Sequence, residues 1–264
     1  MVTQADKAQA FRALHSGEPF VIPNPWDVGS ARALEALGFL ALATTSSGFA
    51  FTLGRTDGKA TLDEVAAHVA AIAEATSIPL SVDLENGYAE DAEGVARAIA
   101  LVAETGAVGG SIEDYGPNRG IYELPEALDR LAAAVEAARS LPFPFTLTAR
   151  AENHIRDNPD LDDTITRLRA YEGAGADVLY APGLRSAEEI RAVCEAVTRP
   201  VNVLVLPGMS VADAFAAGAR RVSVGGGLTW VALGAMVDTA RSLLGGGAMA
   251  RPAATLPLED WLAG

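Results

Sequence analysis

Residues 80–114 read LSVDLENGYAEDAEGVARAIALVAETGAVGGSIED. A short apolar run, Leu80–Leu84, is followed by an Ala-rich amphipathic stretch, Asp91–Thr105, and then by a second apolar run, Gly109–Ile112. Gly106 stands where the helical pattern ends, and glycine is the residue best suited to the left-handed turn that ends a helix. Apolar runs without strict alternation are typical of parallel strands that are buried on both faces. The segment therefore predicts a strand–helix–strand unit with parallel strands.

The same alternation recurs along the chain. The candidate strands are Phe20–Pro23, Phe39–Thr44, Leu80–Leu84, Gly109–Ile112, Phe145–Ala149, Val178–Ala181, Val201–Leu206 and Arg221–Val224. Helical patterns between them include Thr61–Thr76, Asp91–Thr105, Leu124–Ser140 and Ala187–Val197, and Leu228–Leu243 is expected to be the last barrel helix. Eight strands with following helices in roughly 230 residues predict a closed (β/α)8 TIM barrel of the α/β class.

A doubly wound open sheet is the main alternative fold. It would carry a phosphate-binding glycine fingerprint after its first strand, where this chain instead reads Asn24-Pro25-Trp26-Asp27. Because no linker or low-complexity stretch divides the sequence, we expect a single domain over residues 1–264, with the barrel at about 18–245. Residues 246–264, with Pro252, Pro257 and Trp261, are expected to form a short C-terminal helical extension that packs as an arm.

The charge balance excludes several classes of partner. The chain has 34 Asp and Glu residues against 20 Lys and Arg residues, which gives a formal net charge of −14 at pH 7. Surfaces that bind nucleic acid or an anionic membrane need a net excess of Lys and Arg, so we expect neither partner. With one cysteine, Cys194, and three histidines, a disulfide framework and a thiolate zinc cluster are excluded. His15 and His68 fall within helical patterns, and we expect both to face solvent.

Targeting signals are missing from the sequence given. The first twenty residues carry charge early and lack the apolar core of a secretory signal. No apolar run approaches the roughly 20 residues that span a bilayer. We therefore expect a soluble, cytoplasmic protein.

Polar side chains follow four successive predicted strands. The second strand ends in Thr45-Ser46-Ser47-Gly48, the third in Asp83 and Glu85, the fourth in Glu113 and the fifth in Arg150. In a barrel these strand ends meet at one mouth, where active sites lie. Asp83 and Glu85 are two residues apart, so they point to the same side of an extended backbone. Oxygen ligands favour Mg²⁺ or Mn²⁺ over zinc, whereas the alternative is that these groups form salt bridges at the barrel rim.

The order of these motifs resembles that of the isocitrate lyase/phosphoenolpyruvate mutase superfamily. The matching segments, which span about Phe11 to Leu244, are Asn24–Asp27 with Ser30-Ala31-Arg32, Thr45–Gly48, Val82–Tyr88, Ser111–Asp114 and Thr148–Glu152. The resemblance implies an enzyme with a (β/α)8 barrel that binds Mg²⁺. It also implies a homo-oligomer, a dimer or tetramer in which the last barrel helix is exchanged between subunits.

The resemblance further implies roles for individual residues. Asp83 matches the direct metal ligand, and Glu85 and Glu113 match acids that hold the metal's waters. Asp57 resembles another acid of that shell, on a loop after the second strand. Among these, Asp57 and Glu113 are candidate catalytic residues.

Substrate contacts are implied in the same way. Ser47 and Gly48 match a Ser-Gly turn whose hydroxyl and amides bind the carboxylate or phosphonate of the substrate. Arg150, a candidate catalytic residue as well, matches the arginine that reaches the same group, and Thr45 occupies a position where relatives place an aromatic side chain against the substrate. Asp83 also belongs to the expected substrate site, because a chelating substrate shares its metal.

Differences from the family's motifs reduce the number of reactions that we expect of this protein. Where isocitrate and methylisocitrate lyases carry a Lys/Arg-Cys-Gly-His segment, residues 115–122 read YGPNRGIY, without cysteine or histidine. We expect a Mg²⁺-dependent lyase that cleaves a C–C bond of, or decarboxylates, a 2-oxo or 2-hydroxy carboxylate through a metal-stabilised enolate. The alternatives are a phosphonopyruvate or phosphoenolpyruvate mutase, a phosphonate hydrolase, and a non-catalytic 2-oxo-acid binding protein.

Overall fold

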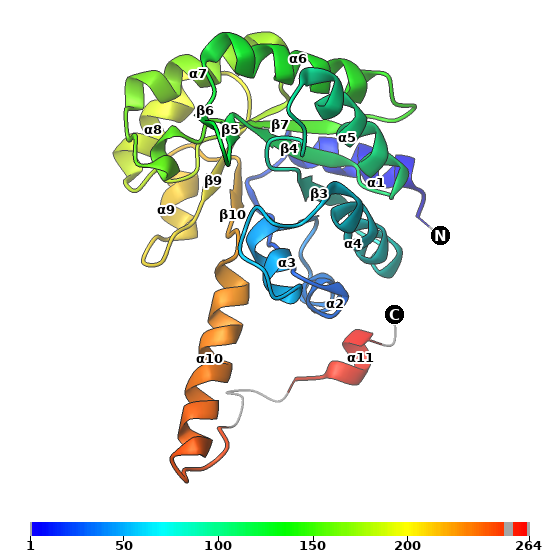
Figure 1. Ribbon diagram of the computed structural model, residues 1–264, viewed down its shortest axis with the longest axis vertical. Coiled ribbons are helices and arrows are strands. Elements are labelled where there is room, and N and C mark those ends of the chain that lie inside the picture. Colours follow the sequence, from blue (N-terminus) through cyan, green and yellow to red (C-terminus); the bar gives the residue numbers. More distant parts are fainter. Residues whose placement is uncertain (1, 251–255, 263–264) are drawn as a thin grey trace.

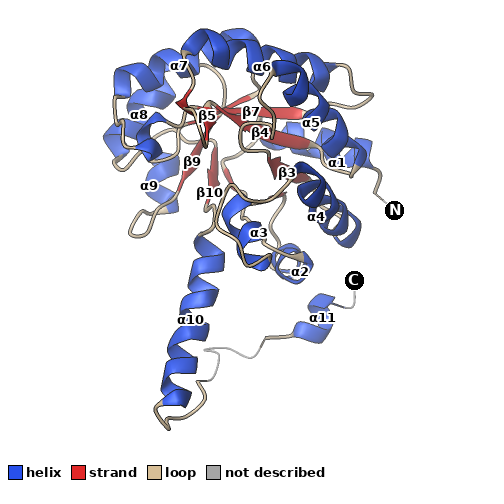
Figure 2. Ribbon diagram, viewed as in Figure 1, coloured by secondary structure: helices blue, strands red, loops and turns tan. Residues whose placement is uncertain are grey.

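The structure, a computed structural model, describes residues 2–250 and 256–262. Figure 1 and Figure 2 show a curled sheet surrounded by helices. Its eight parallel strands are β1 (Phe20–Val21), β2 (Leu42–Ala43), β3 (Leu80–Asp83), β4 (Gly109–Glu113), β7 (Thr146–Arg150), β8 (Val178–Tyr180), β9 (Val201–Leu204) and β10 (Arg221–Ser223). They lie in the order β1-β10-β9-β8-β7-β4-β3-β2, so each strand neighbours the one before and after it in the chain. Every predicted strand is present.

Hydrogen bonds between β1 and β2 close the sheet into a barrel. The backbone N–H of Ala43 donates to the carbonyl oxygen of Pro23 at 3.1 Å. The Asn24 side-chain amide donates to the Ala43 carbonyl at 3.1 Å, and its oxygen accepts from the backbone N–H groups of Val224 and Gly225 at 2.9 Å each. Asn24 thus joins the first, second and last strands, and the predicted closed (β/α)8 barrel is confirmed.

Most of the helices connect strands on the outside of the barrel. The helices are α1 (Gln4–Leu14), α2 (Val28–Ala36), α3 (Ser46–Thr52), α4 (Leu62–Ala75), α5 (Ala92–Glu104), α6 (Leu124–Arg139), α7 (Leu161–Ala174), α8 (Ala187–Ala196), α9 (Val211–Ala216), α10 (Gly227–Leu244) and α11 (Leu258–Leu262). Helix α1 precedes the first strand, and α10 and α11 follow the last. A small hairpin of β5 (Tyr115–Gly116) and β6 (Gly120–Ile121) and a 3-10 turn, Asn153–Arg156, lie at the mouth. Local sequence fixes the helix starts; for example, the Asp91 carboxylate accepts from the Gly94 N–H at 2.7 Å and caps α5.

The expectation that His15 faces solvent is wrong. Helix α1 lies across the amino-terminal end of the barrel, where Phe11 and Phe20 enclose the imidazole with ring centres 4.8 and 5.3 Å away. His15 Nδ1 is 2.8 Å from the Phe11 carbonyl oxygen, and Nε2 is 3.2 Å from Arg221 Nη1. Burial and the Arg221 charge lower the pKa of His15 to about 3. His68 is also only half-exposed, because its ring stacks on Phe49 with the centres 4.1 Å apart.

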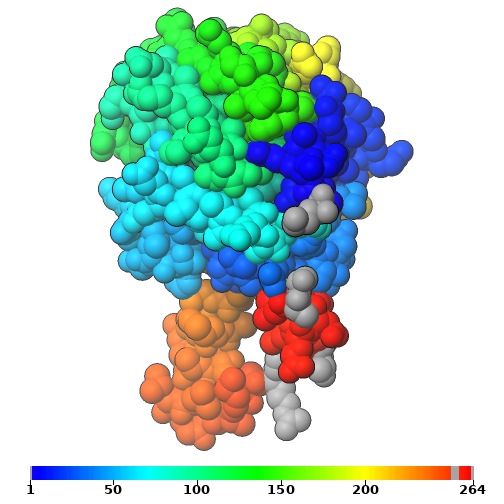
Figure 3. Space-filling view, turned by 90° about the vertical axis from the view of Figure 1, so that its right-hand side faces the viewer, coloured from blue at the N-terminus to red at the C-terminus, as the bar shows by residue number. Residues whose placement is uncertain are grey.

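Helix α10 forms where the sequence predicts it but leaves the barrel. Figure 1 and Figure 3 show it extending from the body as a separate column. Thr229 is its only buried residue, while Val231 and Met236 are 72% and 59% exposed. The helix following the last strand therefore does not cover the barrel of its own chain.

The C-terminal arm is seen in part. Its helix α11 packs against α2, and Arg32 donates to the carbonyl oxygen of Leu262. Residues 251–255 and 263–264 of the predicted arm lie outside the described residues. Within the described part of the chain, no helix has both the length and the apolar character needed to cross a membrane.

The burial of His15 predicts a loss of stability in acid. Because its folded pKa of about 3 lies below the ordinary value of 6.5, the unfolded chain binds the extra proton, and stability falls as pH drops below 6.5. From pH 7.5 to pH 5.0, the wild type should lose about 2 kcal/mol more unfolding free energy than His15→Gln. Urea denaturation at the two pH values measures this difference. Parallel pH dependences in the two proteins would contradict the burial of a neutral His15.

Candidate functional site

A polar cavity of about 210 Å³ opens at the carboxyl ends of the strands. Its wall includes residues after β2, at the end of β3 and β7, and along β8, β9 and β10. Those that concern the site are Thr45, Ser47, Asp57, Asp83, Arg150, Glu152, Arg156, Tyr180, Asn202, Arg221 and Gly226. Three of the four strand ends named from the sequence, those of β2, β3 and β7, therefore supply side chains to one mouth, as the barrel predicts.

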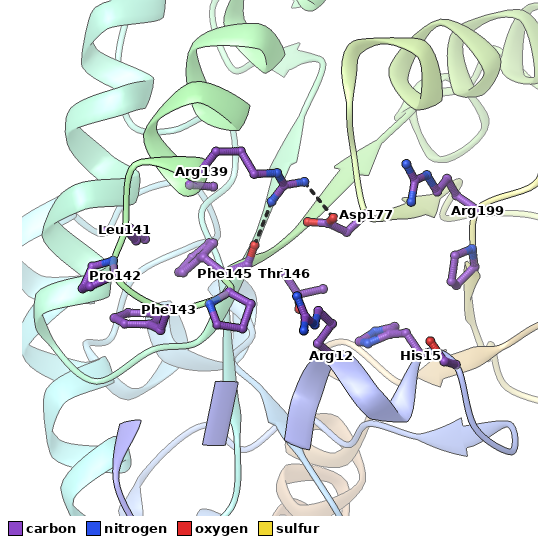
Figure 4. A pocket seen from close by; sticks show the side chains of 14 residues that line it. Arg12, His15, Arg139, Leu141, Pro142, Phe143, Phe145, Thr146, Asp177 and Arg199 are labelled. Atoms are coloured by element: carbon purple, nitrogen blue, oxygen red, sulfur yellow. Dashed lines mark hydrogen bonds and ion pairs between the residues drawn. The ribbon is translucent and has the colours of Figure 1, made fainter. Parts of the chain in front are cut away.

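A larger cavity of about 630 Å³ lies at the other end of the barrel, beside the amino ends of β7 and β9 (Figure 4). Its arginines are exposed, and its one acid, the half-buried Asp177, is paired with Arg139 at 2.7 Å. Arg139 also donates to the Phe145 carbonyl oxygen at 3.3 Å. Since no group of acids converges there, the smaller cavity is the candidate active site.

Arg150 is the centre of the smaller cavity's charge network. Its Nη1 donates to Asp83 Oδ1 at 2.7 Å, and its Nη2 lies 2.9 Å from Glu113 Oε2. Nε and Nη2 donate to Glu152 Oε1 at 3.0 and 2.8 Å. Arg156 supplies a second guanidinium, 3.5 Å from Glu113 and 3.2 Å from Glu152. The arginine expected to bind substrate thus already bridges three carboxylates, as the rim salt-bridge alternative anticipated.

The four acids expected around a metal lie at different depths. Asp57 and Asp83 line the cavity, whereas Glu85 and Glu113 lie behind that wall. The Ser46 N–H donates to Asp83 Oδ2 at 3.2 Å, which fixes the carboxylate toward the start of α3. Glu113 is buried behind Arg150, and burial raises its pKa well above the usual range.

Glu85 reaches the cluster by a route that the sequence did not indicate. Strand β3 ends at Asp83, and Glu85 has a positive φ of 47°, so the expectation that the two acids point to one side of an extended strand does not hold. Its carboxylate accepts from the Tyr88 hydroxyl at 2.7 Å. Burial, with repulsion from Asp83 and Asp57, raises the pKa of Glu85 to about 7. Loss of hydration and the Asp83 charge also raise the pKa of Asp57.

The carboxylates of this site are suitable ligands for a cation that prefers oxygen donors, such as Mg²⁺. Negative groups exceed positive ones, since two arginines face five carboxylates: Asp57, Asp83, Glu85, Glu113 and Glu152. Burial is the main cause of the raised pKa values of Asp57, Glu85 and Glu113, and repulsion from neighbouring carboxylates adds to it, so a nearby cation would favour their charged forms. Among residues 2–250 and 256–262, no three His, Cys, Asp or Glu side chains are close enough to hold an ion by themselves. An ion here would keep water or substrate oxygens as most of its ligands, as Mg²⁺ commonly does.

The predicted Ser-Gly turn is the first turn of α3. Thr45 Oγ1 accepts from the Gly48 N–H at 3.4 Å and lies 3.2 Å from Ser47 Oγ. Thr45 and Ser47 face the cavity, whereas Gly48 lies behind them. A Cβ on Gly48 would come within 2.7 Å of Thr229 Oγ1, so glycine is needed where α10 begins.

Sequence reasoning gave no role to several groups of the site. Glu152 is fully buried beneath Arg150. Its position two residues after Arg150, which places both side chains on one side of an extended chain, was the signal that could have predicted their contact. Tyr180 lies under the guanidinium of Arg150, with 5.3 Å between Arg150 Cζ and the ring centre. Asn202, on β9, lines the cavity, and its side-chain amide donates to Ser223 Oγ at 2.9 Å.

Comparison with known proteins places this arrangement in a family. The model of the phosphoenolpyruvate phosphomutase family matches residues 11–244. The chain belongs to that family. The resemblance to the isocitrate lyase/phosphoenolpyruvate mutase superfamily is thereby confirmed, and with it the expectation of an enzyme of the lyase and mutase kind.

Individual members of the family are similar over most of the chain. A crystal structure of a Burkholderia cenocepacia J2315 protein is 49% identical, with a TM-score of 0.94 over 99% of this chain and 97% of that one. Oxaloacetate decarboxylase of Bradyrhizobium sp. BTAi1 is 30% identical over 92% of this chain and 86% of its own length. Oxaloacetate acetylhydrolase in complex with its product oxalate is 28% identical, with a TM-score of 0.89 over 100% of this chain and 96% of that one.

Removal of Arg150 should leave the buried Glu113 and Glu152 with only the longer contacts to the half-exposed Arg156 among the described residues. Arg150→Ala should lower the unfolding free energy by about 3–5 kcal/mol near neutral pH, because Glu113 and Glu152 are buried beside it. Urea denaturation measures the loss. Arg97→Ala removes a guanidinium from the exposed pair with Glu93 and should change stability little. Equal losses in the two variants would contradict the central position of Arg150.

Proposed function

We propose that this protein is a Mg²⁺- or Mn²⁺-dependent lyase that acts on a C–C bond next to the carbonyl or hydroxyl carbon of a 2-oxo or 2-hydroxy carboxylate. The observation that carries this proposal is the excess of carboxylates over guanidinium groups around a cavity at the strand ends. Such a site favours a divalent cation, and a bound cation favours a chelating anion. The family membership supports the general kind of chemistry.

The residues that would hold the metal follow from their positions. Asp83 lines the cavity and would be the direct ligand, while Asp57, Glu85 and Glu113 surround it at greater distance and would hold its waters. When bound, the divalent cation supplies positive charge that stabilises the negative charge developing on an enolate oxygen. Asp57 faces the cavity from a loop, and the pKa of its carboxyl group is raised. It is therefore the candidate for holding a proton or a water molecule beside the reacting carbon.

Arg150 and the α3 turn would hold the substrate carboxylate. A ligand carboxylate can accept a hydrogen bond from Arg150 Nη1 only if the bond between Nη1 and Asp83 breaks. A cation bound to Asp83 would then neutralise the Asp83 charge in place of Arg150. Ser47 Oγ and Thr45 Oγ1 lie side by side at the cavity wall, where a hydroxyl can donate to the same ligand. Burial of Arg150, whose side chain is 13% exposed, strengthens such a charge-assisted contact.

The loop that replaces the cysteine segment is occupied by structural contacts. Tyr115 stacks beneath Arg156 at 3.8 Å, Arg119 pairs with Glu126, and the buried Tyr122 accepts from Asn86 at 2.9 Å. A proton donor for the reaction is therefore better sought at Asp57.

Two relatives support carboxylate chemistry by their names, whereas the family model is named for a phosphomutase. Both the decarboxylase and the acetylhydrolase are named for oxaloacetate, a 2-oxo dicarboxylate. Steady-state assays with Mg²⁺ or EDTA should test oxaloacetate, 2-oxoglutarate, isocitrate, methylisocitrate and phosphonopyruvate. Mg²⁺-dependent turnover of a carboxylate supports the proposal; turnover of phosphonopyruvate alone supports a phosphonate enzyme, and binding without turnover supports a binding protein.

Asp83→Ala should abolish Mg²⁺-dependent ligand binding while the barrel still folds. The reason is that Asp83, the last residue of β3, faces the cavity with its carboxylate and is the proposed direct ligand of the metal. Calorimetric titration with Mg²⁺, in the presence of oxalate, measures the loss. Asp163→Ala, on the outer helix α7, is the control and should keep the wild-type affinity. Unchanged Mg²⁺ affinity in Asp83→Ala would refute the metal assignment.

We also propose that the protein is a homo-oligomer in which α10 packs on another copy. The exposed apolar side chains of α10 include Trp230, Val231, Met236 and Leu244. Burial of these side chains stabilises association by the hydrophobic effect, and within the described chain no helix or strand makes an extensive contact with α10, although Phe51 lies edge-on against Trp230. A dimer or tetramer with exchanged last helices would give each barrel its eighth outer helix.

Sedimentation velocity at micromolar concentration should give an oligomer for the wild type. Val231→Asp combined with Met236→Asp should shift the protein toward monomer, because charges would be buried in the contact. Arg241→Gln changes the polar side of the helix, where Arg241 faces Asp238, and should leave the mass unchanged. A monomeric wild type would contradict the exchange.

A further inference from the structure

Arg221 is an arginine in the interior of the barrel. It begins β10, is 5% exposed, and reaches the cavity below the acid cluster. Its Nε donates to Asn202 Oδ1 at 2.8 Å, its Nη2 to Thr148 Oγ1 at 3.0 Å, and its Nη1 contacts His15 Nε2 at 3.2 Å. These contacts use three of the five N–H groups of the guanidinium, which leaves two for another partner.

All of these partners are neutral. His15 Nδ1 binds the Phe11 carbonyl oxygen, so its Nε2 carries the lone pair that accepts from Arg221. Within the described residues, no carboxylate lies within 4.0 Å of the guanidinium, in contrast to Arg150 with its three acids. Burial lowers the pKa of Arg221 to about 10, so the group stays charged at neutral pH. An unpaired buried charge is costly unless an anion joins it.

The position of Arg221 relative to Asp83 defines the ligand that could join them. Ser111 Oγ is 3.5 Å from Asp83 Oδ1, and Ser111 pairs in register with Thr148, the residue that holds Arg221 Nη2. Two strand spacings, about 10 Å of backbone, therefore separate β3 from the strand whose side chain contacts the guanidinium. A four- or five-carbon dicarboxylate held beside Asp83 places its second carboxylate farther toward the guanidinium than a two-carbon acid can.

We propose that Arg221 is the specificity-determining residue for a second, distal carboxylate of the substrate, so that the site takes 2-oxo dicarboxylates in preference to 2-oxo monocarboxylates. This assignment rests on the proposed function, because it concerns the far end of the same ligand. Asn202, Thr148 and His15 hold the guanidinium in place before the ligand arrives. Pre-organisation of this kind lowers the entropy cost of binding.

Affinities of three probes test the proposal: oxaloacetate, 2-oxobutanoate, which lacks the distal carboxylate, and oxalate, which is only the reacting end. They are measured with Mg²⁺ as Kd, or as KM where a probe is turned over. The wild type should prefer oxaloacetate to 2-oxobutanoate by about tenfold or more. Arg221→Met should remove that preference and change oxalate affinity less than about twofold. Arg191→Met, an exposed arginine of α8, should behave as the wild type.

Equal weakening of oxalate and oxaloacetate in Arg221→Met would mean that Arg221 only supports the barrel, and it would overturn the proposal. An unchanged preference would overturn it as well. If Arg221→Met does not fold, the wild-type comparison decides, because a wild type that binds 2-oxobutanoate as well as oxaloacetate has no distal subsite. Failure of the wild type to bind oxalate would contradict the proposed function, whereas an Arg221-dependent preference for dicarboxylates would still support the subsite.

Discussion

Asn24 joins β1, β2 and β10, and the closure that it provides is the constraint on which the site depends. A closed parallel barrel brings the carboxyl ends of all its strands into one ring. Five carboxylates are thereby held around a small cavity, with Arg150 and Arg156 as the guanidinium groups that pair with them. Burial, with repulsion between neighbouring carboxylates, raises the pKa values of Glu85 and Glu113, so a cation beside them would favour their charged forms. The proposed cation site is thus a consequence of the closure.

The fold could be predicted because buried parallel strands and glycine-ended helices leave local signals. The bounds differ from the predicted ones by up to a few residues: β2 is Leu42–Ala43 within the predicted Phe39–Thr44, whereas β4 extends one residue past its predicted end, to Glu113. The positions of α1 and α10 could not be predicted in this way. An amphipathic pattern shows that a helix has an apolar face. Which surface covers that face depends on residues far away in the sequence, so the local pattern does not predict it. For that reason His15 is buried against expectation, and α10 forms at the predicted residues yet leaves the barrel.

The candidate site could be predicted as far as strand ends determine it. Asp83 and Arg150 meet because β3 and β7 both flank β4 in the ring. The positive φ of Glu85 depends on turn geometry that no short motif encodes. Arg221 gave no sequence signal, because an arginine at the start of a strand can point inward or outward with equal ease.

Mg²⁺ dependence of stability tests the central claim, that the acid cluster is built for a divalent cation. The free energy of unfolding of the wild type is measured by urea denaturation at pH 8 in EDTA and at rising Mg²⁺ concentrations. A native-state site predicts that stability increases by about 1.4 kcal/mol for each tenfold rise in Mg²⁺ above its Kd. A free energy of unfolding that stays the same from EDTA to millimolar Mg²⁺ would contradict the account.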